Sequence, residues 1–162
     1  LFCLSITQGG DILVGHLVGQ RRYQAAYVLG NYFFRWSMII TLTGSAILAI
    51  SGKSLLSAFT DNQDIITMGV WVLIIDWFLE IGRTSNIFAV STLRTTGDAI
   101  YPVVVAIIFN WTIAVGVSYV IGIPLGYGLV GMWVGFALDE NVRGIILMRR
   151  WRSGKWRDKG FV

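Results

Sequence analysis

Residues that build redox, disulfide and metal chemistry are nearly missing from this sequence. Its 162 residues include one cysteine, Cys3, and one histidine, His16. A single cysteine cannot form a disulfide, a Cys-x-x-Cys redox pair or a thiolate cluster within the chain, and a single histidine is too few for the common zinc motifs. The Gly-x-Ser-x-Gly motif of hydrolases and the paired aspartates of membrane proteases are also missing. We therefore predict that the protein is not an enzyme and holds no cofactor.

Charge is also scarce. Charged residues make up 14% of the chain and hydrophobic residues 55%, whereas a soluble domain carries about 25% charged residues. The mean hydropathy is +0.67. The 7 Trp, 6 Tyr and 9 Phe residues are typical of a membrane protein with aromatic side chains at the lipid interface. The predicted fold class is an all-α polytopic membrane protein with the lipid bilayer as its surroundings.

Basic residues are concentrated at the C-terminus. The net charge is +4, but six of the 13 Lys and Arg residues lie in the last 14 residues. They are Arg149, Arg150, Arg152, Lys155, Arg157 and Lys159. Residues 1–148 hold seven cations and eight acids, which excludes an extended surface for a polyanion. We predict a basic cytoplasmic tail over residues 149–162 beside the membrane, and no nucleic-acid partner.

The longest stretch without charge determines the predicted architecture. Forty uncharged residues separate Asp98 from Asp139, and one helix of that length would be about 60 Å long, twice what the bilayer core needs. The chain must therefore turn back once. The run Gly122-Ile-Pro-Leu-Gly126 marks the reversal, because Pro124 cannot continue a helix. We predict spans at about 103–121 and 127–148.

Three more hydrophobic segments precede this pair. Residues 36–52 are uncharged and 51–64 are rich in polar residues, which predicts a span at 28–50 followed by a loop. A span at 65–90 ends before a turn in which Gly97 stops one helix and Pro102 suits the start of the next. Residues 1–17 are typical of the end of a span. The sequence thus predicts four complete transmembrane helices plus one partial helix within residues 1–148, in a fragment of a longer protein.

The loop cations predict the orientation in the membrane. If the basic tail is cytoplasmic, that side also holds Arg21, Arg22 and Arg94, nine cations in all, and the other side holds Lys53 alone. Cytoplasmic loops carry an excess of Lys and Arg. We therefore expect a multi-pass protein of the cytoplasmic (inner) membrane with its C-terminus in the cytoplasm.

Eight charged residues fall inside the predicted spans. They are Asp11, Arg35, Asp76, Glu80, Arg83, Asp139, Glu140 and Arg143. Charges in hydrocarbon are costly, so they usually pair, face a protein interior and mark pathways for ions or substrates. Asp76, Glu80 and Arg83 are spaced i, i+4, i+7 and share one helix face. Either Glu80 and Arg83 only neutralise each other, or a carboxylate here takes up a proton or Na⁺ during turnover.

A cluster of three charged residues and a lone asparagine inside the spans each have a structural and a functional interpretation. Asp139, Glu140 and Arg143 are spaced for local ion pairs near the cytoplasmic end of their helix. Asn110 is a lone amide that suits a hydrogen bond between helices or a substrate contact. The candidates for coupling or substrate binding are Glu80, Asp76, Arg83 and Asn110, and Na⁺ at Glu80 is the one metal considered.

Four short motifs follow one another along the chain. Gly15-His-Leu-Val-Gly19-Gln20 comes first with Ala25 and Ala26 behind it, then Leu93-Arg94-Thr-Thr-Gly97-Asp98-Ala-Ile-Tyr-Pro102, then Gly128-Leu-Val-Gly131-Met-Trp133-Val-Gly135. Asp139-Glu140 with Arg143 and the run Arg150-Trp151-Arg-Ser-Gly154-Lys-Trp156 close the chain. In this order and spacing, the motifs resemble those of the multidrug and toxic compound extrusion (MATE) family, and they cover nearly the whole sequence.

The resemblance implies a fold and a function. MATE proteins are twelve-helix antiporters of two six-helix lobes, which expel mainly cationic and amphipathic compounds in exchange for Na⁺ or H⁺. This chain would be the back part of the C-terminal lobe, from the end of the eighth span to the twelfth, with the missing N-terminal lobe as its partner and small organic cations as cargo. Many members place an acid in the tenth span. Here Arg83 lies nearer the expected position, and Glu80 is one turn earlier.

Two other functions fit the same hydropathy. A lipid-linked oligosaccharide flippase of the same superfamily needs cations in its cavity for a pyrophosphate, and Arg35 and Arg83 would suit that role. A non-transporting subunit of a membrane complex would not require charged stripes on separate helices. A further seven or so spans encoded upstream would identify the transporter.

Overall fold

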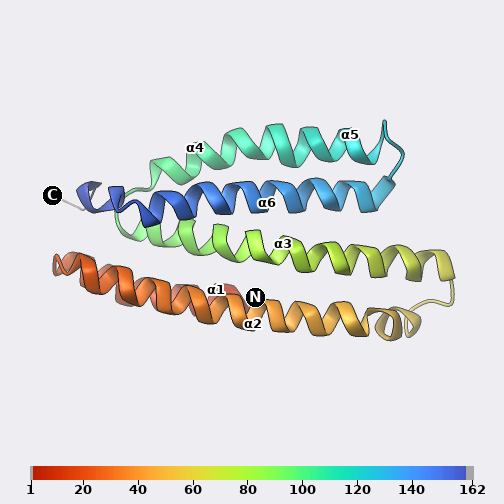
Figure 1. The fold of residues 1–162 in the computed structure, drawn as a ribbon, viewed down its shortest axis with the longest axis horizontal. Helices are drawn as coiled ribbons and strands as arrows, with labels where there is room; N and C mark the ends of the chain where they lie inside the picture. The colour runs from red at the N-terminus through yellow and green to blue at the C-terminus, as the bar shows by residue number, and fades with distance from the viewer. Residues whose placement is uncertain (1, 160–162) are drawn as a thin grey trace.

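Long antiparallel helices make up almost the whole chain (Figure 1). The computed structural model describes the backbone of residues 2–159 and the side chains of residues 9–159. In order, its elements are α1 (Phe2–Gly19), α2 (Tyr23–Ser57), α3 (Gln63–Thr95), α4 (Ile100–Phe109), the π-helical η1 (Asn110–Val117), α5 (Ser118–Gly122), α6 (Gly128–Arg152) and the 3₁₀ helix η2 (Lys155–Lys159). Over these described residues the fold is all-helical, as the sequence predicts.

Local signals in the sequence set the ends of α3. At its start, the side chain of Asn62 accepts hydrogen bonds from the backbone N–H groups of Asp64 at 2.9 Å and Ile65 at 3.3 Å, which is the usual function of an N-cap residue. Beyond its end, Gly97 has a φ of 94°, and the N–H of Asp98 donates to the carbonyl of Leu93 at 2.8 Å. This left-handed closure favours glycine and turns the chain sharply into α4.

The helices form a layered arrangement with loops at two opposite ends. α6 lies between the α4–η1–α5 rod and α3, and α3 lies between α6 and α2 (Figure 1). The α1–α2 turn, the α3–α4 turn and η2 lie at one end, which we call the basic end. The α2–α3 and α5–α6 loops lie at the other end. The exposed cations of the basic end are Arg21, Arg22, Arg94, Arg149, Arg152, Lys155, Arg157 and Lys159.

Three helical segments are long and apolar enough to cross a membrane: Tyr23–Ser57, Gln63–Thr95 and Ile100–Gly122. The first two have 35 and 33 residues, more than the roughly 20 that a span needs. α6 has 25 residues but is less apolar, because Asp139, Glu140 and Arg143 lie near its middle. The structure thus shows three apolar candidate spans where the sequence analysis counts four complete ones.

The largest hydrophobic core lies at the basic end and includes the C-terminal segment. Trp151, near the end of α6, and Trp156 in η2 are both fully buried, and their rings stack with centroids 4.7 Å apart. The indole N–H of Trp156 donates to the carbonyl of Trp151 at 2.9 Å. Tyr27 of α2 also stacks on Trp151, with ring centroids 5.6 Å apart. α6 therefore extends to Arg152, and η2 folds back against the start of α2.

Glycines allow α6 to approach two neighbours closely. A Cβ at Gly82 of α3 would overlap the backbone of Asn141 in α6, and a Cβ at Gly144 would lie 2.8 Å from the carbonyl oxygen of Gly82. On another side of α6, Gly135 lies against Ser118 of α5. Small residues permit such contacts between membrane helices. The charged residues of α6 are consequently held against α3 with little room between the two backbones.

Candidate functional site

The acid and the arginine at the middle of α3 form an ion pair. Arg83 Nη1 donates to Glu80 Oε1 at 2.5 Å, and the two side chains are 39% and 14% exposed. Asp76, one turn earlier, is half-buried and makes no ion pair among residues 9–159. The structure therefore brings Glu80 and Arg83 together, and it leaves Asp76 beside them on the same face without a cation.

A second charged group lies on α6 and is bonded to α3. Arg143 Nη2 donates to Asp139 Oδ2 and, at 3.1 Å, to Glu140 Oε1. Asn86 of α3 donates its side-chain N–H to Glu140 Oε2 at 2.7 Å. Asp139 is 1% exposed, and its other oxygen, Oδ1, is buried without a hydrogen-bond partner. Two carboxylates share one guanidinium here, so the group has a formal charge of −1 when both acids are ionised.

Asn110 lies apart from both charged groups. It is the first residue of the π-helical segment η1, its side chain is exposed, and it makes no side-chain hydrogen bond within the described part of the chain. π-Helical turns within α-helices occur frequently at functional sites. The exposed amide is therefore free to meet a group from outside these residues.

The sequence analysis missed two polar contacts between distant segments. At the basic end, Arg150 Nε donates to Asp98 Oδ2 at 2.7 Å, and its guanidinium lies 4.7 Å from the centroid of the Tyr101 ring. This joins the α3–α4 turn to α6. The other contact is Asn86 to Glu140. The partners are 52 and 54 residues apart, so the location of Asp98 in the motif Leu93–Pro102 was the one sequence signal that pointed to the first.

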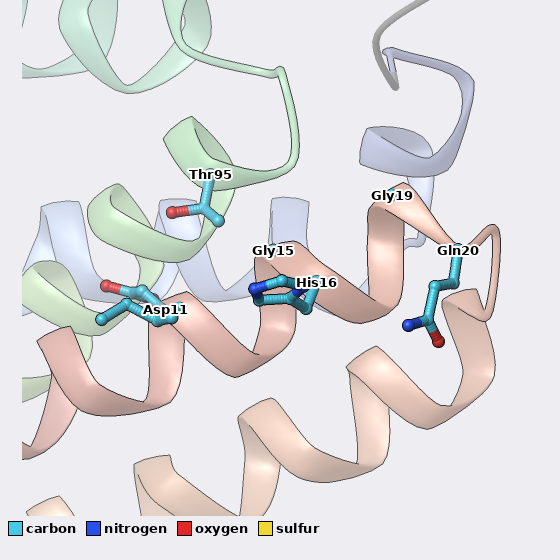
Figure 2. A pocket seen from close by; sticks show the side chains of 7 residues that line it. Asp11, Gly15, His16, Gly19, Gln20 and Thr95 are labelled. Carbon is cyan, nitrogen blue, oxygen red and sulfur yellow. The ribbon is translucent and has the colours of Figure 1, made fainter.

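Asp11 of α1 makes a further buried contact with α3 that the sequence analysis did not predict. Asp11 is 9% exposed, and its carboxylate accepts hydrogen bonds from Ser91 Oγ on Oδ2 and from Thr92 Oγ1 on Oδ1, the latter at 3.2 Å. It adjoins a groove of about 580 Å³ along α1 (Figure 2). The groove is lined by Asp11, Ile12, Gly15, His16, Gly19, Gln20 and Thr95. The sequence placed Asp11 inside a span but assigned it no partner.

These contacts define separate polar groups rather than one centre. Three of the groups are the Glu80–Arg83 pair on α3, the Asp139–Glu140–Arg143 group of α6 with Asn86 of α3, and Asp11 of α1 with two hydroxyls of α3. Helix α3 contributes to each of these three. Within the described residues, no cluster of three or more His, Cys, Asp and Glu side chains has the arrangement of a metal site. The carboxylates of these groups lie within a bundle of membrane helices. Such carboxylates can bind protons or monovalent cations.

Comparison with known proteins places this arrangement in a family. The MatE family model matches residues 1–127. The chain is 39% identical over its whole length to the uncharacterized transporter YisQ of Bacillus subtilis, covering 36% of that protein. It is 28% identical to the probable multidrug resistance protein NorM of Thermotoga maritima, over 93% of the chain and 32% of the relative. The corresponding protein of Idiomarina loihiensis is 24% identical over 92% of the chain and 33% of its own length.

The coverage shows how much of the relatives is represented here. The chain spans about a third of the length of each of these curated proteins. No solved structure matches it.

Proposed function

This chain belongs to the MatE family, and from that premise we propose that it is the back part of the C-terminal lobe of a cation-coupled antiporter. The family assignment agrees with the resemblance drawn from the four motifs, and it is a family of transporters rather than enzymes. Relatives that carry the name multidrug resistance protein support a cargo of organic, mainly cationic or amphipathic compounds. The coupling ion would be Na⁺ or H⁺.

In this proposal α6 is a fourth complete span and α1 the end of another. The charges of α6 are compatible with this placement, because Arg143 neutralises part of them and α3 packs closely against the same part of α6. The eight exposed cations of the basic end support a cytoplasmic location of that end in the inner membrane. The N-terminal lobe of the same protein would cover the exposed polar residues.

The observation that carries the mechanism is the Glu80–Arg83 ion pair. A carboxylate held by an arginine is released when a competing proton, Na⁺ or cationic cargo arrives, and secondary transporters place such groups near mid-membrane. We assign ion coupling to Glu80, with Arg83 as its competing partner and Asp76 as a second acid on the same face. Asn110, exposed in η1, would contact the other lobe or the cargo.

The test is transport by the intact protein that contains this chain. Reconstituted in vesicles, it should export a cationic dye when a Na⁺ or proton gradient is applied, and collapse of that gradient should stop export. The flippase alternative predicts instead that a lipid-linked oligosaccharide crosses the bilayer and that cationic dye does not. In the structure Arg83 is bonded to Glu80, which counts against its use as a pyrophosphate ligand. If the protein transports neither the dye nor the oligosaccharide, the remaining alternative is a non-transporting subunit of a membrane complex.

A further inference from the structure

Asp11 differs from the other buried acids in having no arginine. Over residues 9–159, ion pairs engage Glu80, Asp98, Asp139 and Glu140, each with an arginine, and Asp11 takes part in none. Within residues 9–159, its two oxygens accept hydrogen bonds from the neutral hydroxyls of Ser91 and Thr92 and from no other side chain. A carboxylate buried in a span without a counter-charge is costly. Its charge therefore calls for a proton or a bound cation.

Among the described residues, no charged side chain of the helices packed against α1 forms an ion pair with Asp11. The charged side chains of α2 and α3 are Arg35, Lys53, Asp64, Asp76, Glu80, Arg83 and Arg94, and none of them forms an ion pair with Asp11 within the described residues. On α1 itself, His16 lines the same groove as Asp11 but does not form an ion pair with it. The group facing Asp11 from α3 is thus a pair of hydroxyls.

The groove connects Asp11 to the basic end. Asp11, Gly15 and Gly19 are spaced i, i+4, i+8 and lie on one stripe of α1, and the two glycines leave that stripe without side chains. Gln20, immediately after α1, lines the far end of the groove, and Thr95 lines it from α3 (Figure 2). Asp11 and Gly19 are eight positions apart, which corresponds to about 12 Å along the helix axis. At Gly15 the stripe passes close to Thr95, whose Cγ2 would lie 2.9 Å from an added Cβ.

We propose that Asp11, Ser91 and Thr92 form a binding site for one monovalent cation, Na⁺ or H⁺, which enters along the Gly15–Gly19 groove. The site offers carboxylate and hydroxyl oxygens, the ligands that hard cations prefer. This site is separate from Glu80. A role of the site in ion coupling rests on the proposed function, whereas cation binding at the site does not. Because Ser91 and Thr92 belong to α3, loading the site changes the hydrogen bonds that join α1 to α3.

The experiment is carbodiimide labelling of the intact transporter in membrane vesicles, followed by mass spectrometry of each acid. A hydrophobic carbodiimide reacts with protonated carboxyl groups inside membranes. Labelling of Asp11 should rise severalfold from alkaline to mildly acid pH. If the site takes Na⁺, added NaCl should lower this labelling relative to choline chloride at equal ionic strength. A rise with acidity but no effect of Na⁺ identifies a proton site.

Two variants of α3 provide a matched pair. Ser91→Ala removes a hydroxyl that contacts Asp11 and should shift the pH or the Na⁺ concentration at half-maximal labelling. Ser85→Ala should leave both unchanged, because the Ser85 hydroxyl donates to the carbonyl of Ile81 in its own helix. The proposal is overturned if Asp11 is never labelled, if its labelling ignores both pH and Na⁺, or if the two variants behave alike.

Two variants of α1 test the route. A leucine at Gly19 would begin at the mouth of the groove, where nothing lies within 4 Å of an added Cβ. The Cβ position at Gly9 is equally open, and Gly9 does not line the groove. With a water-soluble carbodiimide added at the basic end, Gly19→Leu should slow labelling of Asp11 severalfold relative to Gly9→Leu. Equal rates would refute the route. In Glu80→Gln, the labelling of Asp11 should still depend on pH or Na⁺. This result would distinguish the Asp11 site from the proposed coupling role of Glu80.

Discussion

The acids inside the predicted spans differ in the partner that balances their charge. Glu80 contacts Arg83 on its own helix, and Asp139 and Glu140 share Arg143. Among the described side chains, Asp11 contacts two hydroxyls and no arginine. Removing one charge from a pair leaves the other unbalanced, whereas removing an unpaired charge does not. Substitutions at these acids therefore have different expected outcomes.

For Glu80, the change is Glu80→Gln in the complete transporter. Gln keeps the shape and removes the charge, so ion-coupled export of a cationic dye should be abolished while expression and insertion remain near those of the parent. Glu80→Asp should retain part of the activity. Dye efflux from vesicles with a defined Na⁺ or pH gradient measures both.

The control for this prediction is the double change Glu80→Gln with Arg83→Gln. If Glu80 served only to balance Arg83, the single variant would lose yield and stability, and the double variant would recover transport. Recovery would exclude a coupling role for Glu80. Continued loss of export with normal yield would support it.

A second prediction at this scale concerns the close contact of α3 with α6. Gly82→Ala would press a methyl group into the backbone of Asn141 and should lower the free energy of unfolding by about 1–3 kcal/mol. Gly44→Ala is the matched control, because Gly44 of α2 has nothing within 4 Å of an added Cβ, and alanine there should stabilise the helix by about 0.5–1 kcal/mol. Unfolding in mixed detergent micelles measures both. Equal effects would contradict the close packing.

Among the elements, η2 has the most unexpected placement. It holds four charged residues, Lys155, Arg157, Asp158 and Lys159, yet it is docked on the bundle by its one tryptophan. Trp156 is buried between Trp151 and Tyr23, whose ring centroid is 6.1 Å away, and Arg157 donates to Gln24 of α2 at 3.4 Å. The C-terminal segment thus connects α6 to the start of α2.

The prediction for this element is that Trp156→Ala releases it. Loss of a buried tryptophan should lower the free energy of unfolding by about 3–5 kcal/mol, and it should expose the chain after Arg152 to trypsin. Lys155→Ala, at an exposed neighbouring position, should leave the stability and the cleavage at the remaining Arg and Lys sites unchanged. Limited proteolysis with mass spectrometry gives the cleavage sites, and an unchanged cleavage rate in Trp156→Ala would contradict the docking.

At the scale of the whole molecule, the two ends of the bundle differ strongly in charge. Exposed cations gather at the basic end, and the other end has Lys53 with Asp61 and Asp64. This difference motivates a test of topology. In a background with Cys3→Ser, cysteines at Ser57 and Ser153 should react with a membrane-impermeant thiol reagent from opposite sides of intact cells, with position 153 cytoplasmic. Reaction of both from one side would refute the proposed number of spans.

The length of the chain gives a last prediction. Because it spans about a third of its relatives, residues 1–162 alone should insert into membranes without exporting dye, since alternating access needs two lobes that move against each other. Co-expression with the remaining part of the transporter is the positive control. Energy-dependent dye extrusion by vesicles that contain residues 1–162 alone would contradict the two-lobe proposal.

The sequence by itself determined that the protein is all-helical and which apolar segments are long enough to cross a membrane. Hydropathy, charge spacing, Asn62, Gly97 and Pro124 act locally, because a helix closes its own hydrogen bonds and a membrane selects apolar segments by length. The family, too, could be read from short motifs in order along the chain. The spacing of Glu80 and Arg83 on one helix was enough to predict that they can pair.

The tertiary structure alone decided which residues from different helices meet. Asp11 meets Ser91, 80 residues away, and Glu140 meets Asn86. Arg150, which the sequence analysis assigned to the basic cytoplasmic tail, is bonded to Asp98. Such pairs depend on how each helix is rotated about its axis and how closely two backbones approach, which glycines such as Gly82 permit. Those quantities are set by the packing of the whole bundle, and no local pattern encodes them.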